Sequence, residues 1–171
     1  MSHPAASSSV PAPVHVPAPV PAPGPDRIAY TAEAHVTGGR DGRAATSDGV
    51  LDLRLALPKS LGGSGDGANP EQLLAIGWAA CFESVLVMLA RKGGLDASGV
   101  AIDARVHLVK QDDGGFALAA ELDVTLPVLD AGAAAGLVRE AHRFCPYSKA
   151  TRGNVPVLFM ANGAAVSAGD V

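Results

Sequence analysis

Cys81 and Cys145 are the two cysteines of this chain, and their thiols are the side chains best suited to redox chemistry. Cys81 lies inside a long apolar segment, and Cys145 stands before a proline in the stretch HRFCPYSKATRGN. A thiolate can attack an oxidant and then form a disulfide with a second thiol. Free cysteines also pack as small, inert hydrophobic side chains. The pair is not in a CxxC arrangement, so spacing alone leaves both interpretations open.

The composition limits the classes of function. With 48% hydrophobic and 4% aromatic residues, the 171-residue chain can bury one core built from Leu, Val and Ala. A net charge of −4 gives no basic patch, so we expect neither nucleic acid nor a membrane surface as a partner. Two cysteines are too few for a disulfide framework or a four-thiolate zinc site. The N-terminus lacks the pattern of a secretory signal, and we expect a cytoplasmic protein.

The start of the chain is rich in proline. Residues 1–27 contain 8 of the 13 prolines, which predicts a disordered Pro/Ala-rich tail. We expect one domain over residues 28–162 and a flexible C-terminal end over residues 163–171.

A long helix should hold Cys81. Asn69, Pro70 and Gln72 fit the N-cap, N1 and N3 positions of a helix start, with Glu71 in the first turn. The segment that follows, LLAIGWAACFESVLVMLARKGG, is apolar on nearly every face, which is typical of a buried helix. A membrane span is the competing interpretation, and Glu83 near its middle argues against it.

Strands should surround this helix. Alternating apolar residues predict strands over 28–37 and 50–57, on either side of the loop GGRDGRAATSDG, and a β-hairpin over 100–110 and 116–126. A second helix is expected over 130–144 and a last strand over 155–160. The element order predicts an α+β fold, with an antiparallel sheet around a long, buried central helix.

Four segments carry a family resemblance: GGRDGRAATSDGVLDL, LPKSLGG, NPEQLLAIGWAACF and AHRFCPYSKATRGNVPV. In this order they resemble the organic hydroperoxide reductase (Ohr) branch of the OsmC/Ohr superfamily, from about residue 30 to residue 160. CPYS followed by ATRGN is more similar to this branch than to that of the osmotically inducible protein C. The resemblance implies the OsmC/Ohr-like fold and an intertwined homodimer.

The resemblance also implies a thiol peroxidase that needs no metal or other cofactor. Matched by motif, Cys81 is the peroxidatic cysteine and Cys145 the resolving cysteine. Arg40 in GGRDG corresponds to the arginine that activates the thiolate, and Glu71 in NPEQ to the carboxylate that holds this arginine. The expected substrates are alkyl or fatty-acid hydroperoxides, and the expected reductant is a dithiol such as a protein-bound dihydrolipoyl group.

Several alternatives stay open. Ten residues separate Glu71 from Cys81, about 15 Å along a continuous helix, so one glutamate cannot reach the thiol. Either the helix breaks near Gly77, or a second copy supplies the carboxylate, and we predict the dimer. For His142 we expect a structural role. The rival functions are an OsmC-branch peroxidase with another peroxide preference, a redox-sensing or ligand-binding module without turnover, and a scaffold with inert thiols.

Overall fold

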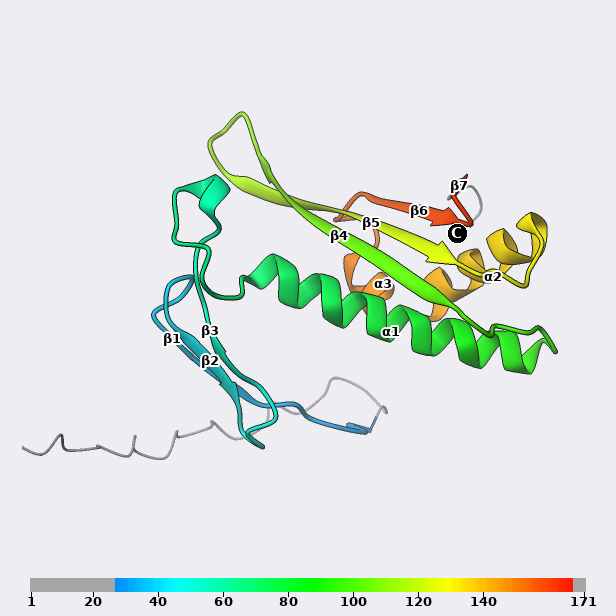
Figure 1. Ribbon diagram of the computed structural model, residues 1–171, viewed down its shortest axis with the longest axis horizontal. Helices are drawn as coiled ribbons and strands as arrows, with labels where there is room; N and C mark the ends of the chain where they lie inside the picture. Colours follow the sequence, from blue (N-terminus) through cyan, green and yellow to red (C-terminus); the bar gives the residue numbers. More distant parts are fainter. Residues whose placement is uncertain (1–26, 168–171) are drawn as a thin grey trace, which may run out of the picture. The chain divides into compact units, whose positions relative to one another are not determined.

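The computed structural model describes residues 27–167 (Figure 1). They form two compact units, residues 27–67 and residues 68–167. The single domain predicted for residues 28–162 is therefore divided at Gly67. The tail predicted for residues 1–27 lies outside the described residues, apart from Arg27.

The first unit is a small antiparallel sheet in the order β1-β2-β3. Its strands are β1 (Ala34–Thr37), β2 (Arg43–Thr46) and β3 (Asp52–Arg54), followed by a short 3-10 helix, η1 (Lys59–Leu61). The loop predicted between two strands was wrong at its centre, where β2 pairs with both neighbours. A tight turn makes this pairing possible: a Cβ at Gly42 would lie 1.9 Å from the Thr37 carbonyl oxygen, so only glycine fits there.

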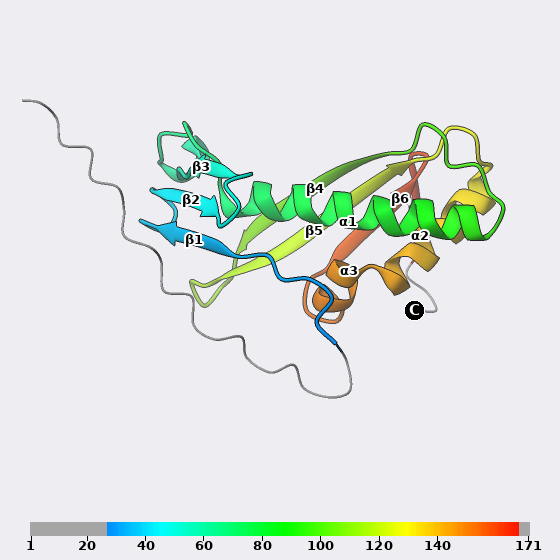
Figure 2. The same cartoon turned by 90° about the horizontal axis from the view of Figure 1, so that it is seen from below.

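The second unit has two layers, a sheet and three helices that cover one of its faces (Figures 1 and 2). The sheet order is β4-β5-β6-β7. In chain order the elements are α1 (Pro70–Lys92), β4 (Ala101–Lys110), β5 (Phe116–Thr125), α2 (Ala131–Phe144), α3 (Pro146–Thr151), β6 (Val157–Ala161) and β7 (Ala164–Val166).

Side-chain caps set the start of each long helix, and the one before α1 confirms the prediction. The Asn69 side chain accepts from the Gln72 backbone N–H, and the Gln72 side chain accepts from the Asn69 N–H, which completes a capping box before α1. Asp130 accepts from the Ala133 N–H in the same way and caps α2. The hairpin of β4 and β5 is also confirmed.

Long-range pairing corrects the rest of the prediction. Because α2 and α3 connect β5 to β6, these strands run parallel, and the predicted antiparallel sheet is mixed. The flexible end expected from residue 163 was wrong for β7, which pairs with β6 and buries Val166. Asn162 fixes the turn between these strands. It has a φ of 49°, and its side chain hydrogen-bonds both the N–H and the carbonyl of Leu126.

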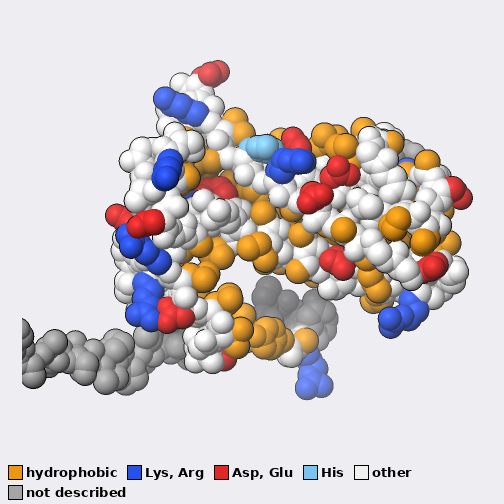
Figure 3. All heavy atoms as spheres, in the orientation of Figure 1, with side chains coloured by type: hydrophobic (Ala, Val, Ile, Leu, Met, Phe, Trp, Pro, Cys, Tyr) orange, Lys and Arg blue, Asp and Glu red, His pale blue; other side chains and the backbone are white. Residues whose placement is uncertain are grey.

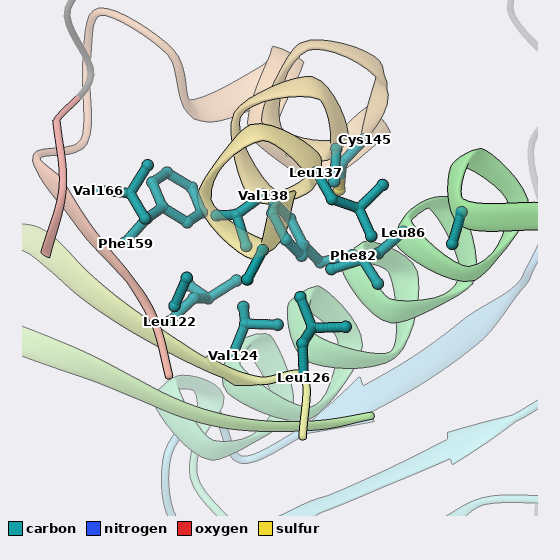
Figure 4. Close-up of a cluster of buried hydrophobic side chains, with 14 of the residues drawn as sticks. Phe82, Leu86, Leu122, Val124, Leu126, Leu137, Val138, Cys145, Phe159 and Val166 are labelled. Carbon is teal, nitrogen blue, oxygen red and sulfur yellow. The ribbon is translucent and has the colours of Figure 1, made fainter. Parts of the chain in front are cut away.

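The core of the second unit lies between the sheet and the helices. Phe82 and Leu86 of α1 meet Leu137 and Val138 of α2 over the sheet residue Leu122 (Figure 4). The Phe82 and Phe159 rings stack with centroids 5.3 Å apart. The two cysteine-bearing segments therefore share one core.

In this single chain, α1 is buried along one face, whereas the sequence predicted burial all round. The buried side chains recur every fourth residue: Trp78, Phe82, Leu86 and Ala90. The opposite face is exposed, with Ile76 68% and Met88 54% accessible. Hydrophobic side chains also show on the surface of this unit in Figure 3. Within residues 27–167, α1 is the one helix long and apolar enough to cross a membrane.

His142, at the end of α2, is a half-buried base with one buried ring nitrogen that lacks a partner among the described residues. Its ring packs against Phe159, with centroids 4.6 Å apart. Its Nδ1 is buried and has no hydrogen-bond partner among the described residues. Burial lowers the pKa of His142 below its ordinary value of 6.5, and the positive charge of Arg152 lowers it further. These contacts support the expected structural role.

His142 should make the stability of the fold depend on pH. The folded state resists protonation of this ring and the unfolded state does not, so the unfolded state binds more protons as the pH falls below about 6.5. The free energy of unfolding should therefore decrease from pH 7.5 to pH 5.5. Urea denaturation at both values should show a smaller decrease in His142→Gln. His107→Gln, at an exposed histidine of β4, is the control, and a decrease in His142→Gln equal to wild type would contradict the prediction.

Candidate active site

The structure brings the two cysteines into contact. The Cys145 thiol donates toward Cys81, with 3.6 Å between the sulfur atoms, and both thiols are free. Cys145 is buried and Cys81 half-buried. A disulfide has an S–S length of about 2.05 Å, so a movement of about 1.5 Å would close the bond. The sequence spacing gave no indication of this contact, which depends on the packing of α1 against the segment after α2.

Cys145 occupies the junction between α2 and α3. Its backbone is extended, with φ −61° and ψ 125°, and its N–H donates to the Ala141 carbonyl at the end of α2. Pro146 then begins α3, where its missing N–H costs nothing and its fixed φ suits the first helical position. The chain therefore turns at Cys145, beside the middle of α1.

Two further contacts hold the start of α3 on α1, and neither was predicted from the sequence. The buried indole N–H of Trp78 donates to the Ser148 hydroxyl at 3.4 Å. A Cβ added at Gly77 would lie 2.7 Å from the hydroxyl oxygen of Tyr147, so this ring lies directly against the helix. The position of Ser148 within CPYS, three residues after Cys145, was the available signal.

The surroundings of Cys81 within the second unit favour the protonated thiol. Burial raises the pKa of Cys81 above its ordinary value, and the neighbouring Cys145 adds to this effect. A hydrogen bond from the Tyr147 backbone opposes the increase. A reactive thiolate at neutral pH therefore needs a positive charge in addition to these groups.

Two further residues were predicted for the site, Arg40 and Glu71. Arg40 belongs to the first unit, in the turn between β1 and β2. Glu71 lies in the first turn of α1, and the helix runs without a break through Gly77 to Lys92. A helix break near Gly77, one of the two predicted alternatives, was wrong. Glu71 is consequently about 15 Å along the axis from Cys81 of the same chain.

No group of three His, Cys, Asp or Glu side chains within residues 27–167 is arranged to hold a metal ion. The chemistry that the described site offers is that of two adjacent thiols.

Comparisons with known proteins identify the family of this chain. The model of the OsmC-like protein family matches residues 63–159. The organic hydroperoxide resistance protein of Xanthomonas axonopodis pv. citri (strain 306) is 47% identical over 135 residues, which cover 78% of this chain and 94% of that protein.

Solved structures give the same result. A Vibrio cholerae O1 biovar eltor structure assigned to organic hydroperoxide resistance is 39% identical, with a TM-score of 0.78 over 83% of this chain and 98% of its own. OhrB of Bacillus subtilis is 42% identical, with a TM-score of 0.71 over 77% of this chain and 98% of its own. The chain therefore belongs to the OsmC-like family and, within it, to the organic hydroperoxide resistance proteins.

Proposed function

We propose that this protein is a cysteine-based peroxidase that reduces organic hydroperoxides to alcohols. The observation that carries the proposal is the contact of two free thiols at 3.6 Å inside an apolar core. The relatives are named for resistance to organic hydroperoxides, which supports a role in peroxide detoxification. Two cysteines that served only to fill the core would not need to place their thiols in contact.

The reaction has three balanced steps. The Cys81 thiolate attacks the terminal oxygen of the hydroperoxide, the O–O bond breaks, and the alkoxide leaves and takes up a proton to become the alcohol. Cys81 is then a sulfenic acid, which Cys145 attacks to form the disulfide with release of water. A dithiol reductant restores both thiols by exchange and becomes a disulfide itself. On the family resemblance, we propose a protein-bound dihydrolipoyl group as this dithiol.

Activation of Cys81 is assigned to Arg40 and Glu71. Because burial raises the pKa of Cys81, the thiolate needs a permanent positive charge beside it, and a guanidinium supplies one together with hydrogen-bond donors for the peroxide oxygens. A carboxylate that binds this guanidinium bidentately would hold it in place. These roles rest on the motif resemblance and on the electrostatic need of the thiol.

A homodimer supplies the missing carboxylate. The continuous α1 keeps Glu71 away from Cys81 of its own chain, and two α1 helices packed antiparallel would bring Glu71 of one copy toward Cys81 of the other. The exposed face of α1, with Ile76 and Met88, offers an apolar surface for this packing. In the Vibrio cholerae relative, captopril is bound in one of the active sites, so that protein has more than one.

The apolar surroundings support organic substrates over hydrogen peroxide. Cys81 packs against a core that includes Phe82 and Leu86, and the Tyr147 side chain, whose backbone hydrogen-bonds Cys81, is 38% exposed. An alkyl or fatty-acid chain gains from leaving water in such surroundings, whereas hydrogen peroxide has no apolar part to bury.

The two cysteines should have separable effects on turnover. With tert-butyl hydroperoxide and dihydrolipoamide, wild type should consume peroxide rapidly, and Cys81→Ser should fall to the uncatalysed rate. Cys145→Ser should still form the Cys81 sulfenic acid, detectable by dimedone trapping and mass spectrometry, without an intramolecular disulfide. Hydrogen peroxide should be the poorer substrate. If wild type is oxidised once and then stalls with every dithiol, a redox sensor replaces the peroxidase.

Complementation between variants tests the shared site. Cys81→Ser and Glu71→Gln should each be inactive alone. When both chains are co-expressed, mixed dimers should contain one intact site, which would restore about a quarter of wild-type activity if the chains assort randomly. Size-exclusion chromatography with light scattering checks that dimers form. A monomeric mass with full activity, or mixed dimers without activity, would contradict the shared site.

A further inference from the structure

We propose that Trp78 and Ser148 are a positioning pair that holds Cys145 on Cys81 and sets the rate of disulfide formation. This inference deepens the proposed peroxidase function and rests on it. We assign neither residue a chemical step, and their effect acts through the two backbone segments that carry the cysteines.

The pair links the same two elements as the sulfur contact. Trp78 lies three residues before Cys81 on α1, and Ser148 lies three residues after Cys145, in α3. Their hydrogen bond, 3.4 Å from Nε1 to Oγ, joins two fully buried side chains. The 3.6 Å sulfur contact and this hydrogen bond therefore both connect α1 to the same short segment, residues 145–148.

Burial increases the cost of losing this long hydrogen bond. A distance of 3.4 Å exceeds the usual N–H···O range, which ends near 3.2 Å. However, an indole nitrogen can only donate, and a buried donor that loses its acceptor bears the full cost of desolvation. The bond should therefore favour the one placement of α3 in which Ser148 meets Trp78.

A second contact acts in the same direction. The Tyr147 hydroxyl lies 2.7 Å from the position that a Cβ of residue 77 would take, so Gly77 lets this side chain approach α1 one turn before Cys81. The Tyr147 backbone also hydrogen-bonds Cys81. Two consecutive residues of α3, Tyr147 and Ser148, are thus tied to α1 around the peroxidatic thiol.

The consequence concerns the oxidised state of Cys81. A sulfenic acid that does not meet a thiol reacts with more peroxide to give a sulfinic acid, which is not returned by simple thiols. Disulfide formation must bring the sulfur atoms from 3.6 Å to about 2.05 Å. By keeping Cys145 at this short range, the pair directs the sulfenic acid to the disulfide before it is oxidised further.

The test separates the two chemical steps. Wild type, Ser148→Ala, Trp78→Phe and the double variant are mixed with one equivalent of tert-butyl hydroperoxide and quenched at intervals. Mass spectrometry then counts dimedone-trapped Cys81, the disulfide and sulfinic acid. Ser98→Ala, the same change at an exposed serine after α1, is the matched control. Circular dichroism and urea denaturation show whether each variant is folded.

In Ser148→Ala, sulfenic acid should form within about twofold of the wild-type rate, while the disulfide should form about 3- to 10-fold more slowly, as expected for the loss of one hydrogen bond. Sulfinic acid should accumulate at excess peroxide. The double variant should be no slower than Ser148→Ala, because either change alone removes the same bond. Ser98→Ala should match wild type.

Two results would overturn the pairing: disulfide formation at the wild-type rate in folded Ser148→Ala, or additive slowing in the double variant. If wild-type Cys81 does not react with any hydroperoxide, the proposed function is wrong, and the positioning role of Trp78 and Ser148 is tested separately. The thiol oxidant diamide, which converts two thiols to a disulfide without a peroxide, should then link Cys81 to Cys145 more slowly in Ser148→Ala. Equal rates with diamide would reject the pairing by itself.

Discussion

The packing of the Cys145 junction against the middle of α1 is the interaction on which the proposed chemistry depends. It brings together two thiols that the chain separates widely, and it does so by ending one helix and starting another at the cysteine. The shared core of α1, α2 and the sheet holds both segments, with Phe82 stacked on Phe159 near the sulfur pair. Both thiols thus lie in or against one hydrophobic core in the second unit.

Burial has two opposite effects on the proposed reaction. Apolar surroundings would favour organic hydroperoxides, but the same burial raises the pKa of Cys81 and disfavours the thiolate that the proposed attack requires. The cation and the carboxylate proposed to resolve this conflict come from Arg40 and Glu71. The exposed face of α1 is consistent with this proposal, because a second copy that covers Ile76 would also bring a second Glu71.

The sequence correctly predicted those elements whose boundaries depend on interactions between residues close together in the chain. The capping box at Asn69 and the alternation in β4 and β5 each act within a few residues, and both are confirmed. The errors lie where distant segments pair: β2 between its neighbours, the parallel β6 and the C-terminal β7. The cysteines were matched by family motif, while their contact and that of Trp78 with Ser148 arise only from tertiary packing.

Trp78 is the single tryptophan of the chain, and it is fully buried three residues from Cys81. Indole emission changes in wavelength and intensity with the polarity and the sulfur chemistry of its surroundings. All of the tryptophan fluorescence of this protein therefore originates from one place, beside the thiol pair. The unlabelled chain carries its own optical reporter of the redox state of Cys81 and Cys145.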